Sequence, residues 1–89
     1  ALHGVQLWVA QPEATRTGAP AFEHHAELPV VEPGGGARAT VVVGELAGQR
    51  SPARADHPAV AADLAVRARV ELPLVEAFEH ALVVLEGVL

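Results

Sequence analysis

Cysteine, methionine, tyrosine and lysine are all absent from this 89-residue sequence. The lack of cysteine excludes a disulfide framework, a thiolate metal site and a cysteine nucleophile. Six scattered arginines face 11 acidic residues, which gives a formal charge of -5 and no basic stripe to neutralise phosphates. Aromatic residues make up only 3% of the chain, so base-stacking platforms are lacking as well. We therefore expect no direct nucleic-acid partner.

Long apolar runs are also absent. No stretch approaches the ~20 residues that span a bilayer, and the N-terminus lacks the zones of a signal peptide, so we expect no membrane partner and a soluble, cytoplasmic protein. The hydrophobic content of 51% indicates a folded chain. Both ends have the character of cut ends, because Ala1 is not an initiator and Val88 and Leu89 form an apolar terminus. Removal of an initiator methionine before Ala1 is the alternative.

Residues 3–10 form an apolar stretch that contains the only tryptophan, Trp8. Side chains on both alternating faces are largely apolar, which predicts a strand covered on at least one face. Its partners would have to come from later residues, another chain or missing sequence. Residues 11–36 follow as a connector, because prolines and glycines interrupt any regular element. We expect this connector to be packed, anchored by Leu28, Val30 and Val31, with Phe22 as a second contact.

Three further strands are predicted. Residues 38–46 carry a run of branched side chains, with Gly44 marking a bulge or a close approach, and 47–52 form a turn. Residues 56–72 are ambiguous, because Asp56 before Pro58 is typical of a helix start. The alternation of apolar and polar residues from 60 to 72 nevertheless favours a strand. After a loop at 73–80, the run 81–85 predicts a last strand. The fold class is therefore all-β, with about four strands whose open edges need cover.

The stretch Gly-Val-Gln-Leu-Trp-Val-Ala at 4–10, with Pro12 close behind, resembles a segment of the pirin family of two-domain cupin proteins. Further matches follow in the same order, and their positions are 20–25, 38–44, 51–52, 60–66 and 78–87. The resemblance covers nearly the whole chain but only the middle of a pirin. It implies a segment of a cupin (β-barrel or jelly-roll) fold with an incomplete barrel. Residues 1–10 would then be the closing strand of the N-terminal cupin, residues 11–36 the interdomain linker, and residues 37–89 the first part of the C-terminal cupin.

Histidines and carboxylates are the remaining candidates for chemistry. His24 and His25 are neighbours whose rings face opposite sides of an extended chain, so they do not share a metal. Together with Glu23 and Glu27, these two histidines are typical of a surface cluster. His57, beside Pro58, is typical of an ordinary turn. His3 suits a polar strand start. Ser51, the only serine, lacks a nucleophile elbow. The carboxylates of Glu71, Glu76 and Glu79 show no acid–base spacing and suit a charged surface.

Phe78-Glu79-His80, followed by Glu86, is the most suggestive group, because histidine and glutamate are the ligand types of non-haem iron sites. In the metal-bearing cupin of pirins, histidines precede the corresponding phenylalanine by three and five residues. Here Val75 and Pro73 occupy those places, and neither binds a metal. The motif therefore resembles the metal-free cupin of the pair, and we interpret His80 as structural. No residue of this chain is assigned as catalytic, cofactor-binding or metal-ligating.

What the resemblance implies concerns a longer parent protein. In that protein, iron or another divalent metal is held upstream of Ala1, and a flavonoid such as quercetin is opened by dioxygen. The first alternative is a non-catalytic, metal-dependent regulatory or interaction protein, for which the acidic charge suits protein contacts. The second is an inert structural half-cupin that associates with itself or with the missing cupin parts. By itself the 89-residue chain is expected to bind no cofactor and to be inactive.

Overall fold

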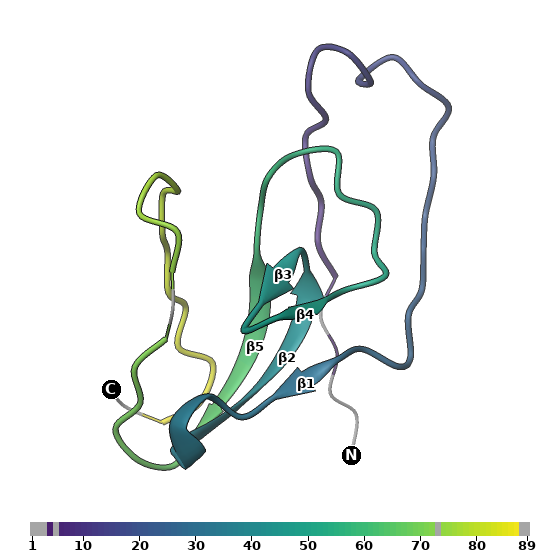
Figure 1. The fold of residues 1–89 in the computed structure, drawn as a ribbon. Coiled ribbons are helices and arrows are strands. Elements are labelled where there is room, and N and C mark those ends of the chain that lie inside the picture. The colour runs from purple at the N-terminus through teal and green to yellow at the C-terminus, as the bar shows by residue number, and fades with distance from the viewer. Residues whose placement is uncertain (1–3, 5, 73, 88–89) are drawn as a thin grey trace.

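The computed structural model describes residues 4, 6–72 and 74–87, and these residues fold as antiparallel β-structure without an α-helix. This confirms the all-β fold class. One sheet has the order β1-β2-β5 and a second is the pair β3-β4 (Figure 1). The elements are β1 (Val30–Val31), the short 3-10 helix η1 (Pro33–Gly35), β2 (Ala37–Val43), β3 (Glu45–Leu46), β4 (Gln49–Arg50) and β5 (Ala61–Val66).

Strand β2 is the centre of the fold because it pairs with β1 on one edge and with β5 on the other. Its branched residues suit a pleated sheet, and its alternating side chains Ala39 and Val41 are completely buried. They form a core cluster with Val31 and Leu46, against which Ala62 and Leu64 of β5 pack. The predicted strand at 38–46 is thus confirmed as β2 and β3, which are separated by a break at Gly44.

Gly44 makes the break between β2 and β3. Its φ of 78° lies in the left-handed region, which a side chain disfavours. A Cβ at this position would also collide with the backbone carbonyl of Ala59. The pairing of β2 with β5 shifts register just before it, between Val41 and Val43. Of the two alternatives expected of Gly44, the close backbone approach is confirmed, while the register irregularity lies just before it in β2.

The β3–β4 hairpin turns through two residues, Ala47 and Gly48, with φ of 49° and 83°. Positive φ at both central positions is the signature of a type I′ turn, whose twist matches that of paired strands. The turn predicted over 47–52 is therefore confirmed but shorter, because Gln49–Arg50 already forms β4.

Strand β5 confirms the strand interpretation within 56–72 but ends earlier than the alternation predicts. Beyond Val66 the amides of Arg67 and Ala68 both donate to the carbonyl of Gly36, at 2.8 and 3.1 Å. Because one turn carbonyl takes both donors, the chain bends away and the ladder stops. Continuation of the strand to residue 72 was wrong, although the apolar alternation persists there.

The connector at 11–36 contributes to the hydrophobic core at its C-terminal end. Val31 in β1 enters the core at 9% exposure, whereas Phe22 is 77% exposed and the contact expected of it was wrong. Figure 1 shows the earlier part of the connector as a wide excursion away from the sheet. Near its start, a turn is closed by the amides of Thr15 and Arg16, which both donate to the carbonyl of Pro12.

The first and last predicted strands do not form within the described residues. Residues 6–10 and 81–85 belong to no strand, and Trp8 is 89% exposed. Residues 3 and 5 of the first stretch lie outside the described part. The physical reason is the absence of a partner: both edges of β2 are occupied, and neither segment pairs with the outer edge of β1 or β5. The loop expected at 73–80 is confirmed over 74–80.

The dimensions of the molecule reflect these unpaired segments. Its accessible surface is 7503 Å², whereas a compact monomer of 9.2 kDa exposes about 4900 Å². Its radius of gyration is 14.2 Å, against about 12 Å for a compact chain of this length. Across the described residues, no helix is long and apolar enough to cross a bilayer.

Candidate functional site

A polar cluster joins the excursion to the loop between β4 and β5. Arg54 donates from Nε and Nη2 to the two carboxylate oxygens of Asp56, both at 2.7 Å. Its backbone amide donates to Oε2 of Glu23 at 3.0 Å, across 31 residues of sequence. The same Glu23 oxygen lies 3.0 Å from Nε2 of His25. Two segments that carry charged side chains, 23–25 and 54–56, are thereby held in one chain of contacts.

The electrostatics of this cluster follow from its hydrogen bonds. The bidentate contact with Arg54 is the largest cause that lowers the pKa of Asp56 to about 2. For Glu23, the hydrogen bond with His25 and then the backbone amide of Arg54 lower the carboxyl pKa. Asp56 in turn raises the pKa of Arg54. All three groups are therefore charged at neutral pH, and the cluster works as a clasp between two loops.

His57 extends the clasp toward the N-terminal stretch. Its Nε2 contacts the carbonyl oxygen of Ala10, which ties the loop before β5 to the end of the first predicted strand. The interpretation of His57 as a turn residue is confirmed, since it lies in a bend, and its ring has a structural contact that sequence spacing did not indicate.

The remaining candidate ligands do not converge. Among the residues that the structure describes, no group of three or more histidine, cysteine or acidic side chains is arranged to hold a metal ion. His24 is exposed beside His25, while Glu79, His80 and Glu86 are exposed in the C-terminal loops. His3 lies outside the described residues. The histidines and carboxylates of the described part thus do not fit a metal centre.

The other candidates have structural or surface roles. Ser51 is buried at 6% exposure, and its hydroxyl donates to the carbonyl of Val42 at 2.7 Å. The same oxygen accepts the amide of Ala53 at 3.1 Å. Glu71 lies 3.8 Å from Arg69, with both side chains about nine-tenths exposed, and Glu76 is exposed as well. A charged surface was the correct prediction for these carboxylates.

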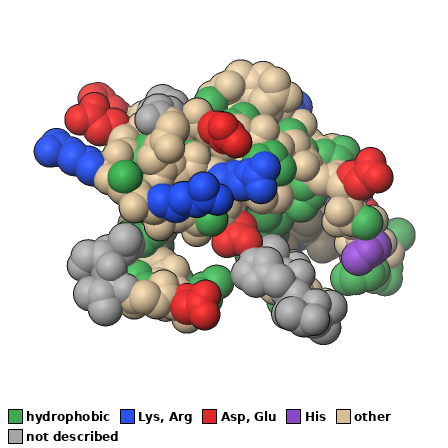
Figure 2. Space-filling view, turned by 90° about the horizontal axis from the view of Figure 1, so that it is seen from below, with side chains coloured by type: hydrophobic (Ala, Val, Ile, Leu, Met, Phe, Trp, Pro, Cys, Tyr) green, Lys and Arg blue, Asp and Glu red, His purple; other side chains and the backbone are tan. Residues whose placement is uncertain are grey.

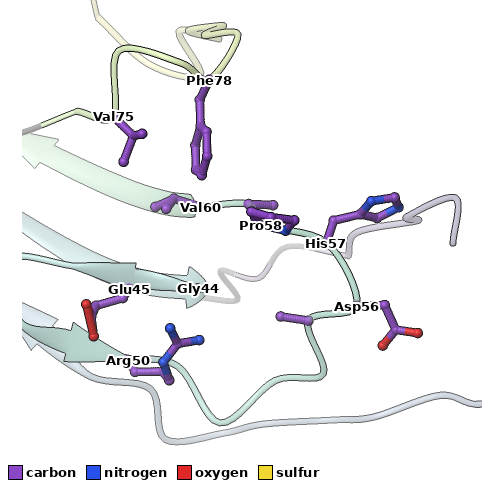
Figure 3. Close-up of a pocket in the computed structure, with 11 residues that line it drawn as sticks. Gly44, Glu45, Arg50, Asp56, His57, Pro58, Val60, Val75 and Phe78 are labelled. Carbon is purple, nitrogen blue, oxygen red and sulfur yellow. The ribbon is translucent and has the colours of Figure 1, made fainter. Parts of the chain in front are cut away.

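A pocket of about 470 Å³ opens beside the β3–β4 hairpin. Arg50 of β4 and Glu45 of β3 form one side of it, and Val60, Val75 and Phe78 supply apolar walls. In Figure 3 the guanidinium of Arg50 extends between the hairpin and the loop before β5, while the ring of Phe78 hangs toward Val60 and Pro58. The side chains of Asp56 and His57 point away from this space in the same view.

A second, wider hollow of about 1140 Å³ lies between the excursion and the sheet. Phe22, Glu23 and His25 line it from the excursion, and Thr40 and Asp63 line it from β2 and β5. Figure 2 shows arginine side chains next to one another in the middle of one face, with acidic and apolar side chains around them.

Comparison with known proteins gives one relative. The chain is 42% identical over 87 residues to a Pseudomonas aeruginosa protein named "Putative quercetin 2,3-dioxygenase". The match covers 96% of this chain but only 27% of that protein, so the chain spans about a quarter of the relative's length. No protein-family profile matches the chain, and no solved structure matches it.

Sequence reasoning missed the clasp and the pocket. Glu23 and Arg54 are 31 residues apart, and Arg50 and Phe78 belong to a hairpin and a distant loop. The one local signal was the pair Arg54 and Asp56, whose separation of two residues allows a contact in an extended or bent chain.

Proposed function

We propose that the chain is a segment of a pirin-like two-domain cupin whose parent protein is a metal-dependent dioxygenase that acts on flavonols such as quercetin. The observation that carries this proposal is the 42% identity over nearly the whole chain to the Pseudomonas aeruginosa relative and its dioxygenase name. The all-β architecture supports it, because cupins are built from antiparallel strands. The motif at 4–10 supports the pirin assignment.

The metal of the proposed oxygenase belongs to another part of the parent protein. When bound, such a metal supplies the activation of dioxygen and substrate. The described residues of this chain hold no convergent ligand set, so no catalytic step is assigned to them. Their proposed role is architectural: β2 and β5 form one sheet of the second barrel, and the clasp of Glu23, Arg54 and Asp56 fixes the linker against it.

The test of the proposed activity is oxygen consumption by the full-length gene product in the presence of quercetin. The proposal predicts consumption that depends on quercetin and is removed by a chelator, while the 89-residue chain alone shows none. Oxygen uptake that is absent from a folded, metal-loaded gene product would contradict the dioxygenase assignment. Kaempferol and an unrelated phenol, assayed in parallel, separate a flavonol enzyme from a general phenol oxidase.

Exposed apolar segments favour a second candidate, a role in association. Leu82, Val83 and Leu85 are each at least two-thirds exposed, and Trp8 is 89% exposed. Large exposed apolar patches mark interaction sites, and the four consecutive apolar residues at 82–85 are all exposed here. We infer that residues 6–10 and 81–85 contact the remaining cupin parts in the parent protein and mediate self-association when the chain is alone. A non-catalytic interaction protein would retain this surface and lack oxygen uptake.

A further inference from the structure

The pocket beside the β3–β4 hairpin contains two residues of opposite charge that do not form an ion pair with each other. Glu45 and Arg50 lie directly opposite in the hairpin register, which places their side chains on the same face. Within the part of the chain that the structure describes, no ion pair or hydrogen bond engages either side chain. By contrast, four other arginines each form an ion pair with an acidic side chain, and their positions are 16, 38, 54 and 69.

These two side chains offer complementary hydrogen-bonding groups. The guanidinium of Arg50 presents only donors, in a planar fork that matches a carboxylate. The carboxylate of Glu45 presents only acceptors, so it suits a hydroxyl donor and disfavours a second bare anion beside it. A ligand that satisfies both carries an anionic acceptor group and a hydroxyl group.

The opposite side of the pocket is apolar. Val60, just before β5, and Val75 and Phe78 in the C-terminal loop line the same space (Figure 3). The ring of Phe78 is half-buried and offers a face or edge against which a flat ring packs. A volume of about 470 Å³ falls within the usual range for small-molecule pockets, roughly 300–1,000 Å³.

We propose that this pocket binds a hydroxylated aromatic carboxylate, with its carboxylate on Arg50, its hydroxyl on Glu45 and its ring against Phe78. The inference goes beyond the proposed oxygenase function, because it concerns side chains of this chain alone. It is tested by binding, without any measurement of activity, so its failure leaves the oxygenase proposal standing.

The first test varies the ligand. Saturation-transfer NMR on the 89-residue chain follows 4-hydroxybenzoate, 4-hydroxybenzyl alcohol and 4-hydroxycyclohexanecarboxylate. Loss of the carboxylate is expected to weaken binding roughly tenfold, the usual value of a charge-assisted hydrogen bond. Loss of the aromatic ring is expected to weaken it roughly 2- to 10-fold. Equal affinity for acid and alcohol, or no saturable binding of 4-hydroxybenzoate, would overturn the proposal.

The second test varies the protein. Arg50→Gln is expected to weaken 4-hydroxybenzoate roughly tenfold, while Arg67→Gln, which removes the same charge from an exposed arginine outside the pocket, leaves affinity within about twofold. Phe78→Leu is compared in the same way with Phe22→Leu. Equal weakening by Arg50→Gln and Arg67→Gln would reduce the effect to net charge and refute the site. If Arg50→Gln does not fold, the ligand series decides.

Discussion

Ser51 is a single hydroxyl that completes the hydrogen bonding of two backbone groups. It donates to the carbonyl of Val42 and accepts the amide of Ala53 in a largely buried position. Ser51→Ala leaves both groups without this partner, and we expect it to lower the free energy of unfolding by roughly 1–3 kcal/mol. Urea titration measures the loss. Thr17→Ala, at an exposed hydroxyl, should change stability by less than about 0.5 kcal/mol; similar small effects for both would refute the role of Ser51.

Asp56 predicts a pH dependence of stability. Its pKa is lowered from 3.8 to about 2 in the folded chain, chiefly by the hydrogen bonds from Arg54. A carboxyl group with a depressed folded pKa stabilises the fold above its unfolded pKa and loses that contribution as the pH falls. We therefore expect the stability difference between the wild-type chain and Asp56→Asn to be constant above about pH 5 and to shrink between about pH 4 and 2.

Urea midpoints measured across this pH range provide the test. Glu86→Gln, at an exposed carboxylate outside the clasp, serves as the matched control. Because the pair Arg54–Asp56 is near the surface, added salt should reduce the effect. A stability difference that does not change down to pH 2 would show that the clasp does not form in solution.

At the scale of elements, Gly44 and Gly48 show two different physical reasons why a position requires glycine. Both have positive φ, but only at Gly44 does an added Cβ meet backbone, at Ala59. Gly48→Ala is expected to cost roughly 1–2 kcal/mol, the penalty of the left-handed region. Gly44→Ala must in addition displace the backbone at 59–60, just before β5, and is expected to cost more. Thermal or urea unfolding measures the loss of stability in both variants. An equal loss would show that the close approach of the 59–60 segment to Gly44 does not restrict this position.

The central elements were predictable because local patterns and their partners agree. The valine run of β2 and the alternation of β5 lie in one antiparallel pair, and the Ala-Gly turn closes another, the β3–β4 hairpin. The strands at 6–10 and 81–85 were not correctly predicted, since apolar alternation states what a segment favours and not whether a partner is present. Here the described residues offer them none.

The candidate site was less predictable than the strands. The clasp depends on a contact between Glu23 and Arg54 across 31 residues of sequence, and the pocket is lined by residues of separate segments, such as Arg50 and Phe78. No periodicity encodes such contacts, because loop paths decide them. The sequence did allow local metal-binding motifs to be argued against. His24 and His25 are adjacent and so do not share a metal, and His80 lacks the two histidines expected before Phe78.

At the scale of the whole molecule, surface area is the informative quantity. An accessible surface about half as large again as that of a compact monomer means that much of the apolar sequence has no cover within the described chain. The core holds only a few side chains around β2. Stability is therefore expected to be marginal and to rise with association.

A substitution at Trp8 tests directly whether apolar side chains of the isolated chain lack cover. Because its side chain is 89% exposed, Trp8→Ala should change the stability of the monomeric chain by less than about 1 kcal/mol. In the parent protein, where residues 6–10 are proposed to be covered, the same substitution should cost roughly 3–5 kcal/mol. Urea unfolding of both proteins measures the difference. A large loss in the isolated chain would show that the indole is already in a core.

We propose that this chain is the metal-free part of a longer metal-dependent oxygenase. The decisive measurement is elemental analysis of metal per chain, on the 89-residue chain and the full-length gene product after the same dialysis. We expect about one equivalent of iron or another divalent metal in the longer protein and none in the shorter. One tight equivalent in the 89-residue chain that is lost in His80→Ala, or no metal in either protein, would contradict it.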